Sequence, residues 1–232
     1  MNKLYEALRN INWHNPQESF APIANILMGE YVIQKGNCRY AIVEIEFYAF
    51  SKDHKDFITY PRTIKCGRWY FHQSGVDLTF ESICDKNELR FGGVLIRGLY
   101  KLNQSGGKGT YVFGPKKCVN ELWDDFDAFD SSDEYPIIVN ASAEDNLSID
   151  NIINCKRCIN INKELRRQKI IDWAKRVDMV IHESDLVRYE KEMFITPTTQ
   201  LYRFFNLHNG ENPYTFSEIP ALSRPQKLTL PI

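Results

Sequence analysis

Residues 39–50 constrain the fold more than any other part of the chain, because they read as one long β-strand that carries charge in its middle. The centre of this segment is Ala41-Ile42-Val43-Glu44-Ile45-Glu46-Phe47-Tyr48. Successive side chains of a strand point to opposite faces of a sheet. Alternation therefore predicts that one face holds Ile42, Glu44, Glu46 and Tyr48 and that the other holds Val43, Ile45 and Phe47. Two carboxylates and a phenol would then share one face, about 7 Å apart between alternate residues.

The rest of the chain supplies partners for this strand. Residues 31–34 and 39–50 form the arms of a predicted hairpin around Lys35-Gly36-Asn37. Further strands are predicted over 69–72, 77–81, 94–102, 135–139 and 200–206. Helices are predicted over 2–10, from Pro16 to Gly29, from Pro115 to Trp123, and over 163–176 with Leu165, Ile170 and Trp173 inward. Many strands with few long helices indicate a single α+β domain over residues 1–232, with a curved, mostly antiparallel β-sheet surrounded by helices.

Composition narrows the classes of protein that fit. The chain has 232 residues and a net charge of −1. It has no apolar run near the roughly 20 residues that a membrane-spanning helix needs. The first residues have no features of a secretory signal and the six cysteines are scattered, so we expect a cytoplasmic protein with reduced thiols. Cys155-Lys156-Arg157-Cys158 has the spacing of a zinc-binding pair, but no second pair follows, so we expect ordinary thiols and no metal.

The distribution of charge is uneven along the chain. Residues 52–117 hold 12 Lys or Arg and 6 Asp or Glu, residues 121–150 hold 10 acidic and no basic residues, and residues 156–176 hold 8 basic and 2 acidic ones. Two basic segments around an acidic one can form a basic face on a near-neutral protein. Ordinary solvated surfaces give the same distribution, so charge alone leaves both interpretations open.

Glu44 and Glu46 are the residues in the chain best suited to chemistry. Two carboxylates on one face suit general acid–base catalysis, because each perturbs the protonation of the other. The alternative is a half-buried strand with an exposed polar face, and periodicity alone favours that alternative.

Blocks of sequence around these residues carry a resemblance. The block Phe20-Ala21-Pro22-Ile23-Ala24-Asn25-Ile26-Leu27-Met28-Gly29-Glu30-Tyr31 is a helix that leads through a glycine into a strand, and Ile42-Val43-Glu44-Ile45-Glu46-Phe47-Tyr48 follows after a hairpin. Then come, in order, Gly67-Arg68-Trp69-Tyr70-Phe71-His72, Gly93-Val94-Leu95-Ile96-Arg97, Gly114-Pro115-Lys116 and Leu201-Tyr202-Arg203-Phe204-Phe205. In their order these blocks resemble the 3-methyladenine (alkyladenine) DNA glycosylase family, well over residues 20–117 and loosely beyond.

The resemblance implies roles for the matching residues. Glu46 would activate the attacking water, and Tyr48 would stack on a flipped base. Arg97 would lie in the active site, where it would orient Glu46 or contact a phosphate; a salt bridge inside the fold is the alternative. Glu44, one step along the same face, would belong to the same site.

Other positions match the family less directly. His72 stands where the family has a second stacking tyrosine, and its alternative is a core histidine. His54 is the nearest candidate for the family's pocket histidine, and Thr79 for its small polar residue that screens bases. The turn Gln73-Ser74-Gly75 stands where the family inserts a tyrosine into the DNA, and it offers no such wedge.

The function that the resemblance implies is excision of damaged purines in base excision repair. A monofunctional glycosylase of this kind flips an alkylated or deaminated purine out of double-stranded DNA and hydrolyses its N-glycosidic bond, without a cofactor. We expect a monomer with no membrane association. Two alternatives stay open: a relative that binds nucleotides or nucleic acid without catalysis, and a hydrolase of free nucleosides or other small N-glycosides that uses Glu44 and Glu46.

Overall fold

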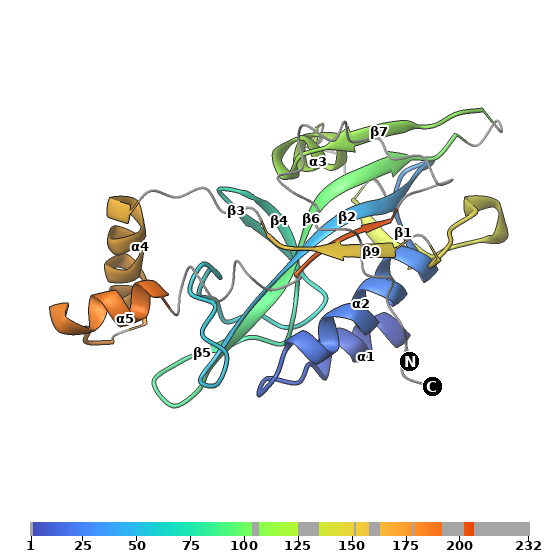
Figure 1. Cartoon of the computed structure of the whole chain (residues 1–232). Coiled ribbons are helices and arrows are strands. Elements are labelled where there is room, and N and C mark those ends of the chain that lie inside the picture. The colour runs from blue at the N-terminus through green and yellow to red at the C-terminus, as the bar shows by residue number, and fades with distance from the viewer. Residues whose placement is uncertain are drawn as a thin grey trace, which may run out of the picture.

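The computed structural model describes residues 2–103, 107–124, 135–150, 152–157, 163–177, 179–191 and 202–206 (Figure 1). The helices in this part of the chain are α1 (Lys3–Arg9), α2 (Gln17–Glu30), α3 (Pro115–Leu122), α4 (Lys163–Arg176) and α5 (Leu186–Glu190), with 3₁₀ turns η1 (Ala143–Asp145) and η2 (Glu183–Asp185). The strands are β1 (Tyr31–Lys35), β2 (Cys38–Ser51), β3 (Trp69–His72), β4 (Gly75–Thr79), β5 (Ile83–Cys84), β6 (Leu89–Lys101), β7 (Thr110–Phe113), β8 (Ile137–Asn140), β9 (Ile152–Cys155) and β10 (Arg203–Asn206).

The described strands belong to one sheet. Its main order is β3-β4-β6-β2-β1-β8, while β5 and β7 also pair with β6, and β10 pairs with β2 and β9. The recorded pairs are antiparallel. These findings confirm the predicted α+β class and the mostly antiparallel sheet. The sheet is uncurled, so the expected curvature is wrong, because alternation in a sequence specifies which face of a strand is buried but not how neighbouring strands coil.

The predicted elements are largely present, with shifted ends. The strand expected over 77–81 runs from Gly75 to Thr79, and the one expected from residue 94 already begins at Leu89. Helix α2 continues one residue past Gly29, to Glu30, so the predicted end at Gly29 is wrong. The absence of a side chain at Gly29 makes room for Ile149, whose Cγ2 would lie 2.2 Å from a Cβ added at Gly29. The predicted residues 200 and 201 of the last strand, the side chain of Leu165 and residues 125–134 of the acidic loop lie outside the described residues.

β2 is the central strand of the sheet, and its side chains do not alternate regularly. The pairing of β2 with β6 has register shifts between Ile42 and Glu44 and between Glu44 and Ile45. As a result Ile42 packs in the same core cluster as Ile45, whereas Val43 packs with Ala41 in a different one. The predicted faces of Ile42 and Val43 are therefore wrong, because a bulge lets consecutive side chains fall on one side of a strand.

The two helices near the N-terminus cover one face of the sheet. Phe20 of α2 stacks on Phe47 of β2 with ring centroids 4.5 Å apart, and Ile23 and Leu27 are buried beside it. Figure 1 shows α1 and α2 together on one side of β2 and β6. The carboxylates of β2 consequently project from the face that α1 and α2 do not cover.

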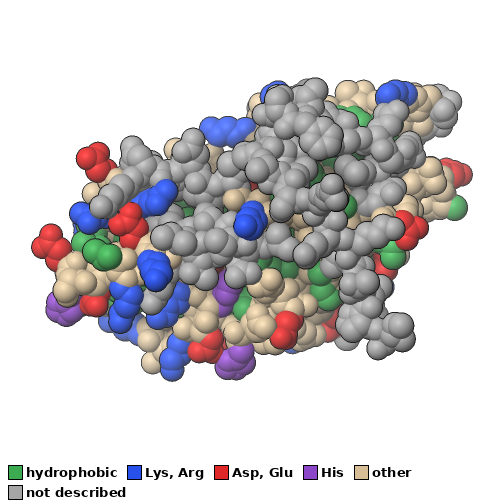
Figure 2. All heavy atoms as spheres, viewed as in Figure 1, with side chains coloured by type: hydrophobic (Ala, Val, Ile, Leu, Met, Phe, Trp, Pro, Cys, Tyr) green, Lys and Arg blue, Asp and Glu red, His purple; other side chains and the backbone are tan. Residues whose placement is uncertain are grey.

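α4 covers a second, smaller core. Its Ile170 and Trp173 are buried as predicted, and they pack in a cluster with Phe50, Phe57 and Phe91. Figure 2 shows Lys and Arg side chains gathered at the end of the molecule that carries α4 and α5, with acidic side chains among them. None of the described helices is long and apolar enough to cross a bilayer.

Candidate active site

Two buried carboxylates lie at the middle of β2. Glu44 and Glu46 are each 2% exposed. Glu46 stands opposite Leu95 of β6 on one side and Arg203 of β10 on the other. Because β2 is paired along both edges here, the carboxylates are held by the sheet itself and not by a loop.

One guanidinium connects the two carboxylates. Nε of Arg97 donates to Oε1 of Glu44 at 2.7 Å, and Nη1 of Arg97 lies 2.8 Å from Oε2 of Glu46. Nε of Arg203 donates to the same Glu44 oxygen at 2.7 Å. Burial alone would lower the pKa of Arg97, but the carboxylates of Glu46 and Glu44 together raise it above the ordinary arginine value. Arg97 therefore forms the salt bridge considered as an alternative, and in doing so it fixes the orientation of Glu46.

Glu46 keeps one carboxylate oxygen outside this network. Within the described residues its interactions involve Oε2, and no hydrogen-bond partner of Oε1 is found there. Glu44 differs, because it receives donors from both Arg97 and Arg203. The two carboxylates are thus not equivalent: Glu44 is enclosed by cations, whereas Glu46 has an oxygen that can accept a proton or a hydrogen bond.

Tyr48 lies on the same strand and has a cation against its ring. The guanidinium carbon of Arg157 is 4.8 Å from the centre of the Tyr48 ring and 4.9 Å from that of Tyr202. Arg157 also forms a bidentate pair with Asp56, at 2.8 and 3.1 Å, and donates to the carbonyl oxygen of Phe47 at 3.1 Å. Burial, and to a smaller degree the Glu46 carboxylate, raise the pKa of Tyr48 well above the ordinary tyrosine value. Tyr48 is therefore a neutral phenol with a guanidinium stacked on it.

His54 lies at the edge of this arrangement and not beside Glu46. Its Nε2 is 3.3 Å from the hydroxyl of Tyr202, which in turn flanks Arg157. Burial is the main cause that lowers the pKa of His54, and Arg157 lowers it further against the opposing effect of Asp56. His54 is consequently a neutral hydrogen-bonding group near neutral pH.

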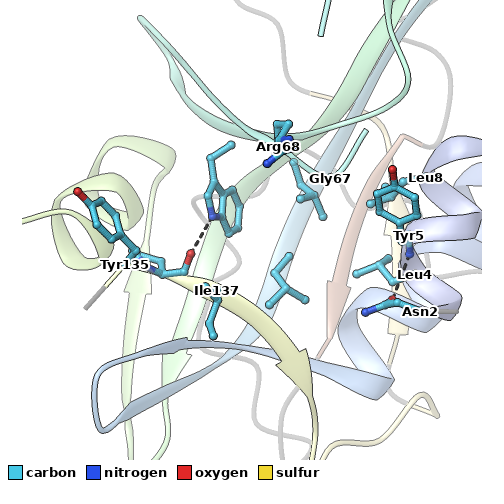
Figure 3. A pocket seen from close by; sticks show the side chains of 12 residues that line it. Asn2, Leu4, Tyr5, Leu8, Gly67, Arg68, Tyr135 and Ile137 are labelled. Atoms are coloured by element: carbon cyan, nitrogen blue, oxygen red, sulfur yellow. Dashed lines mark hydrogen bonds between the residues drawn. The ribbon is translucent and has the colours of Figure 1, made fainter. Parts of the chain in front are cut away.

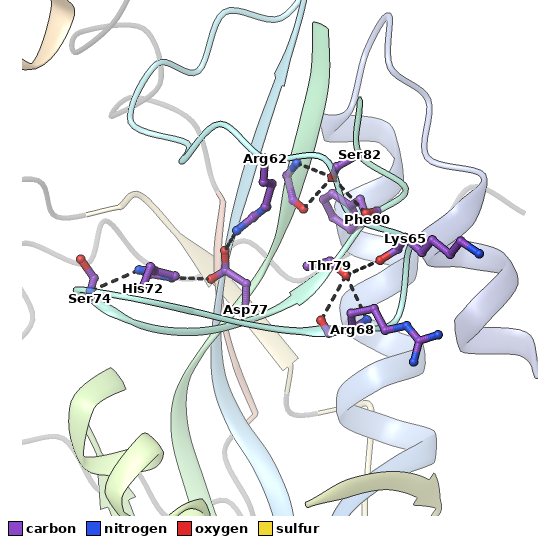
Figure 4. A network of polar contacts seen from close by, with 10 residues as sticks. Arg62, Lys65, Arg68, His72, Ser74, Asp77, Thr79, Phe80 and Ser82 are labelled. Carbon is purple, nitrogen blue, oxygen red and sulfur yellow. Dashed lines mark hydrogen bonds and ion pairs between the residues drawn. The ribbon is translucent and has the colours of Figure 1, made fainter. Parts of the chain in front are cut away.

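His72 belongs to a separate buried network on β3 and β4 (Figure 4). The backbone N–H of Ser74 donates to Nδ1 of His72 at 3.2 Å, so Nε2 is the ring nitrogen that donates to Oδ1 of Asp77, at 3.0 Å. Nη1 of Arg62 donates to the other Asp77 oxygen at 2.7 Å. Burial would raise the pKa of Asp77, but Arg62 and His72 lower it below the ordinary value. The ring of His72 is 4.7 Å from that of Tyr60, so it already has an aromatic neighbour.

Arg62 has two donors to spare. Its Nε and Nη2 are buried and have no hydrogen-bond partner among the described residues. These atoms share one edge of the guanidinium, and a Cβ added at Gly93, opposite Tyr48, would lie 3.0 Å from Nη2. The unpaired edge of Arg62 therefore lies close to Gly93, the residue of β6 that pairs with Tyr48.

Thr79 holds a loop together. Its hydroxyl donates to the carbonyl oxygens of Lys65 and Arg68 at 2.8 and 3.1 Å and accepts from the backbone N–H of Arg68 at 3.0 Å (Figure 4). These backbone groups use the hydroxyl, which leaves Thr79 a structural role that the resemblance did not indicate.

The structure therefore brings together only part of the predicted set. Glu44, Glu46 and Arg97 are in direct contact, and Tyr48 lies near them on the same strand. His72 is farther away: its partner Asp77 is separated from Glu46 by Leu95 of β6, which is roughly 10 Å at ordinary strand spacing.

Sequence reasoning missed the cations and acids that organise the site: Asp56, Arg62, Asp77, Arg157 and Arg203. The signal that could have found Arg203 is a charge inside the apolar run Leu201-Tyr202-Arg203-Phe204-Phe205.

The described residues contain no metal site, and no similar protein was found. The described residues contain no group of three or more His, Cys, Asp or Glu side chains placed to hold a metal ion, and Cys158 lies outside them. Comparisons of the chain with family models, curated proteins and solved structures found no match.

Proposed function

We propose that this chain is a DNA glycosylase-like hydrolase that flips an alkylated or deaminated purine out of double-stranded DNA and hydrolyses its N-glycosidic bond. The observation that carries the proposal is the buried Glu46, held by Arg97 at 2.8 Å and placed two residues before Tyr48 on one strand. The motif resemblance assigns a water-activating role to this carboxylate and a base-stacking role to this tyrosine. The proposal includes the finer likeness to the alkyladenine glycosylase fold and a role in base excision repair.

The chemistry needs one carboxylate oxygen that is free to accept a proton. Oε1 of Glu46 would take a proton from water as the water oxygen attacks C1′ of the deoxyribose. The bond between C1′ and the purine nitrogen breaks, and its electron pair leaves with the base. The Glu46 carboxylate also stabilises the positive charge that develops on the sugar. Arg97 orients Glu46 through Oε2, and the free edge of Arg62 offers two donors to acceptor atoms of a base.

The test is single-turnover excision with duplexes that contain hypoxanthine, ethenoadenine or 3-methyladenine. Glu46→Gln keeps an acceptor for Arg97 but cannot take a proton from water, so excision should fall by about 10²- to 10⁴-fold while duplex binding persists. Glu88→Gln, at an exposed residue of the loop before β6, is the matched control and should leave both unchanged. Equal excision by wild type and Glu46→Gln would contradict the proposed role of Glu46.

Glu44→Gln separates a structural from a catalytic role of the second carboxylate. Since Glu44 pairs with two arginines, its loss should lower the melting temperature more than the loss of Glu46 does. At a temperature where both variants are folded, Glu44→Gln should retain more excision activity than Glu46→Gln. Equal loss of excision would indicate that both carboxylates take part in the reaction.

A binding protein without catalysis is the second candidate, and the position of Arg157 favours it. A guanidinium already stacks on the ring of Tyr48, the ring on which a flipped base would have to stack. Under this candidate the wild-type protein binds damaged duplex or nucleotide and excises none of the three bases. Excision by the wild type rules it out.

A further inference from the structure

A cavity lies on the side of the sheet away from the carboxylates. Its volume is about 400 Å³, and it lies between α1, the β3–β4 hairpin and the start of β8 (Figure 3). Its inner wall includes Leu4, Leu8 and Leu78, which belong to the same core cluster as Phe47. Because the proposed catalytic residues do not line it, the cavity is independent of the proposed function.

The rim of the cavity is aromatic and open to solvent. Tyr5, Tyr135 and Ile137 line it and are 39%, 62% and 53% exposed. Large apolar side chains with this exposure around a concavity mark binding sites more often than plain surface. At Gly67 the wall consists of backbone only, and an added Cβ would lie 3.3 Å from the ring of Tyr5. The backbone of Gly67 therefore packs close to the Tyr5 ring, with no side chain of its own between them.

Most polar groups of the wall are used within the fold. Nε1 of Trp69 donates to the carbonyl oxygen of Pro136 at 2.8 Å. Oδ1 of Asn2 accepts from the backbone N–H of Tyr5 at 3.2 Å and from the hydroxyl of Tyr31 at 3.0 Å. Trp69 consequently offers a ligand its ring and not its N–H, so the interior favours an apolar, flat group.

Arg68 provides charge at the wall. Its backbone N–H and C=O are bonded to Thr79, but its guanidinium has no hydrogen-bond or ion-pair partner among the described residues. An uncompensated cation beside an apolar, aromatic concavity complements a ligand that carries an anion on a flat ring system.

We infer that this cavity binds a small aromatic acid, with the ring system between α1 and Trp69 and the anionic group at Arg68. Two fluorescent probes differ in the feature that matters: 8-anilinonaphthalene-1-sulfonate carries the anion, and N-phenyl-1-naphthylamine has the same rings without it. Both are measured by isothermal titration calorimetry on the full chain. The sulfonate should bind in a saturable manner with one molecule per chain, and more tightly than the neutral probe.

Substitutions in and near the cavity wall test where the probes bind and whether the charge of Arg68 contributes to binding. Arg68→Gln should weaken the sulfonate by about 3- to 10-fold and leave the neutral probe within about two-fold, since an exposed charge contributes modestly. Lys65→Gln removes the same charge from an exposed residue of the same loop that does not line the cavity, and should change neither probe. Leu78→Phe adds volume to the wall and should weaken both probes more than 10-fold.

Tyr5→Ala tests the rim of the cavity, and three results would overturn the inference. Tyr5→Ala removes an exposed ring, so it tests the site even where Leu78→Phe fails to fold, and it should weaken both probes. Absence of saturable binding overturns the inference, as does equal loss of the sulfonate in Arg68→Gln and Lys65→Gln. Unchanged binding of both probes in Tyr5→Ala also overturns it.

Discussion

The buried pair of Arg157 and Asp56 gives the sharpest test of how this molecule is held together. Both side chains are fully buried, and the two hydrogen bonds between them join the residues after β9 to the loop after β2. The perturbation is Asp56→Asn, which keeps the size of the side chain and removes its charge. The guanidinium of Arg157 then stays buried between Tyr48 and Tyr202 and loses the carboxylate with which it forms its bidentate pair.

The stability that Asp56→Asn should lose follows from the burial of both partners. Because neither side chain reaches water, solvent does not screen the pair, and removal of one partner should cost about 3–5 kcal/mol. For a chain of this size, about 2–4 °C in melting temperature corresponds to each kcal/mol, so Asp56→Asn should melt roughly 6–20 °C lower than the wild type. Replacing both partners, with Asp56→Asn and Arg157→Met, should cost less than the sum of the two single changes.

The assay is chemical denaturation followed by tryptophan fluorescence, with thermal melts alongside. Asp185→Asn is the control, because it makes the same chemical change in an exposed pair with Arg188, at 37% and 59% side-chain exposure. Exposed pairs contribute about 0–1 kcal/mol, so the control should stay close to the wild type. If Asp56→Asn costs no more than Asp185→Asn, the buried pair does not hold these segments together and the reasoning is wrong.

Three further changes test the core, the sheet and the pH response. Phe47→Ala removes the ring that stacks on Phe20 and should lower the free energy of unfolding by about 3–5 kcal/mol in urea denaturation; a cost below 1 kcal/mol would contradict the packing. Gly98→Ala would place a Cβ 2.8 Å from the Cβ of Glu44, so it should destabilise by about 1–3 kcal/mol in thermal melts, and an unchanged melting temperature would refute the close approach. Because burial lowers the folded-state pKa of His54, its contribution to stability is complete above the unfolded pKa of about 6.5 and is lost as pH falls below it; His54→Gln should flatten the decline in stability between pH 7 and pH 5, and an unaltered slope would exclude His54 as its source.

The fold could be predicted from the sequence where local patterns decide it. The hairpin around Gly36 is marked by a turn between two alternating strands, and α4 by apolar residues at helical spacing, so both appear as predicted. The short strands β5, β7 and β9 were not predicted, because two to four residues carry little periodicity; β3, β8 and β10 are equally short but lie in longer aromatic or apolar runs of the sequence.

The candidate site could be predicted only along β2. Glu44 and Glu46 are neighbours in the sequence, and their shared contact with Arg97 crosses a single strand pair. Arg157 lies 110 positions from the Phe47 carbonyl that it contacts, so no local sequence pattern could predict this contact. The β-bulge near Val43 could not be predicted for a different reason. A bulge depends on a mismatch in register between two strands and not on the sequence of either strand alone.

The pairing of β10 with β2 has a consequence for the folding route. Glu44 and its partner Arg203 are 159 positions apart, so this edge of β2 closes only after a long loop has formed, and contacts of such long range form slowly. Until β10 arrives, β2 presents an unpaired edge at Glu44 and Glu46, of the kind on which separate chains pair and aggregate. Before Arg203 arrives, these two carboxylates share the guanidinium of Arg97, so two negative charges stand against one positive charge and repel a second copy of the same strand. The acidic residues that form the candidate site would therefore also protect the unfinished sheet from self-association.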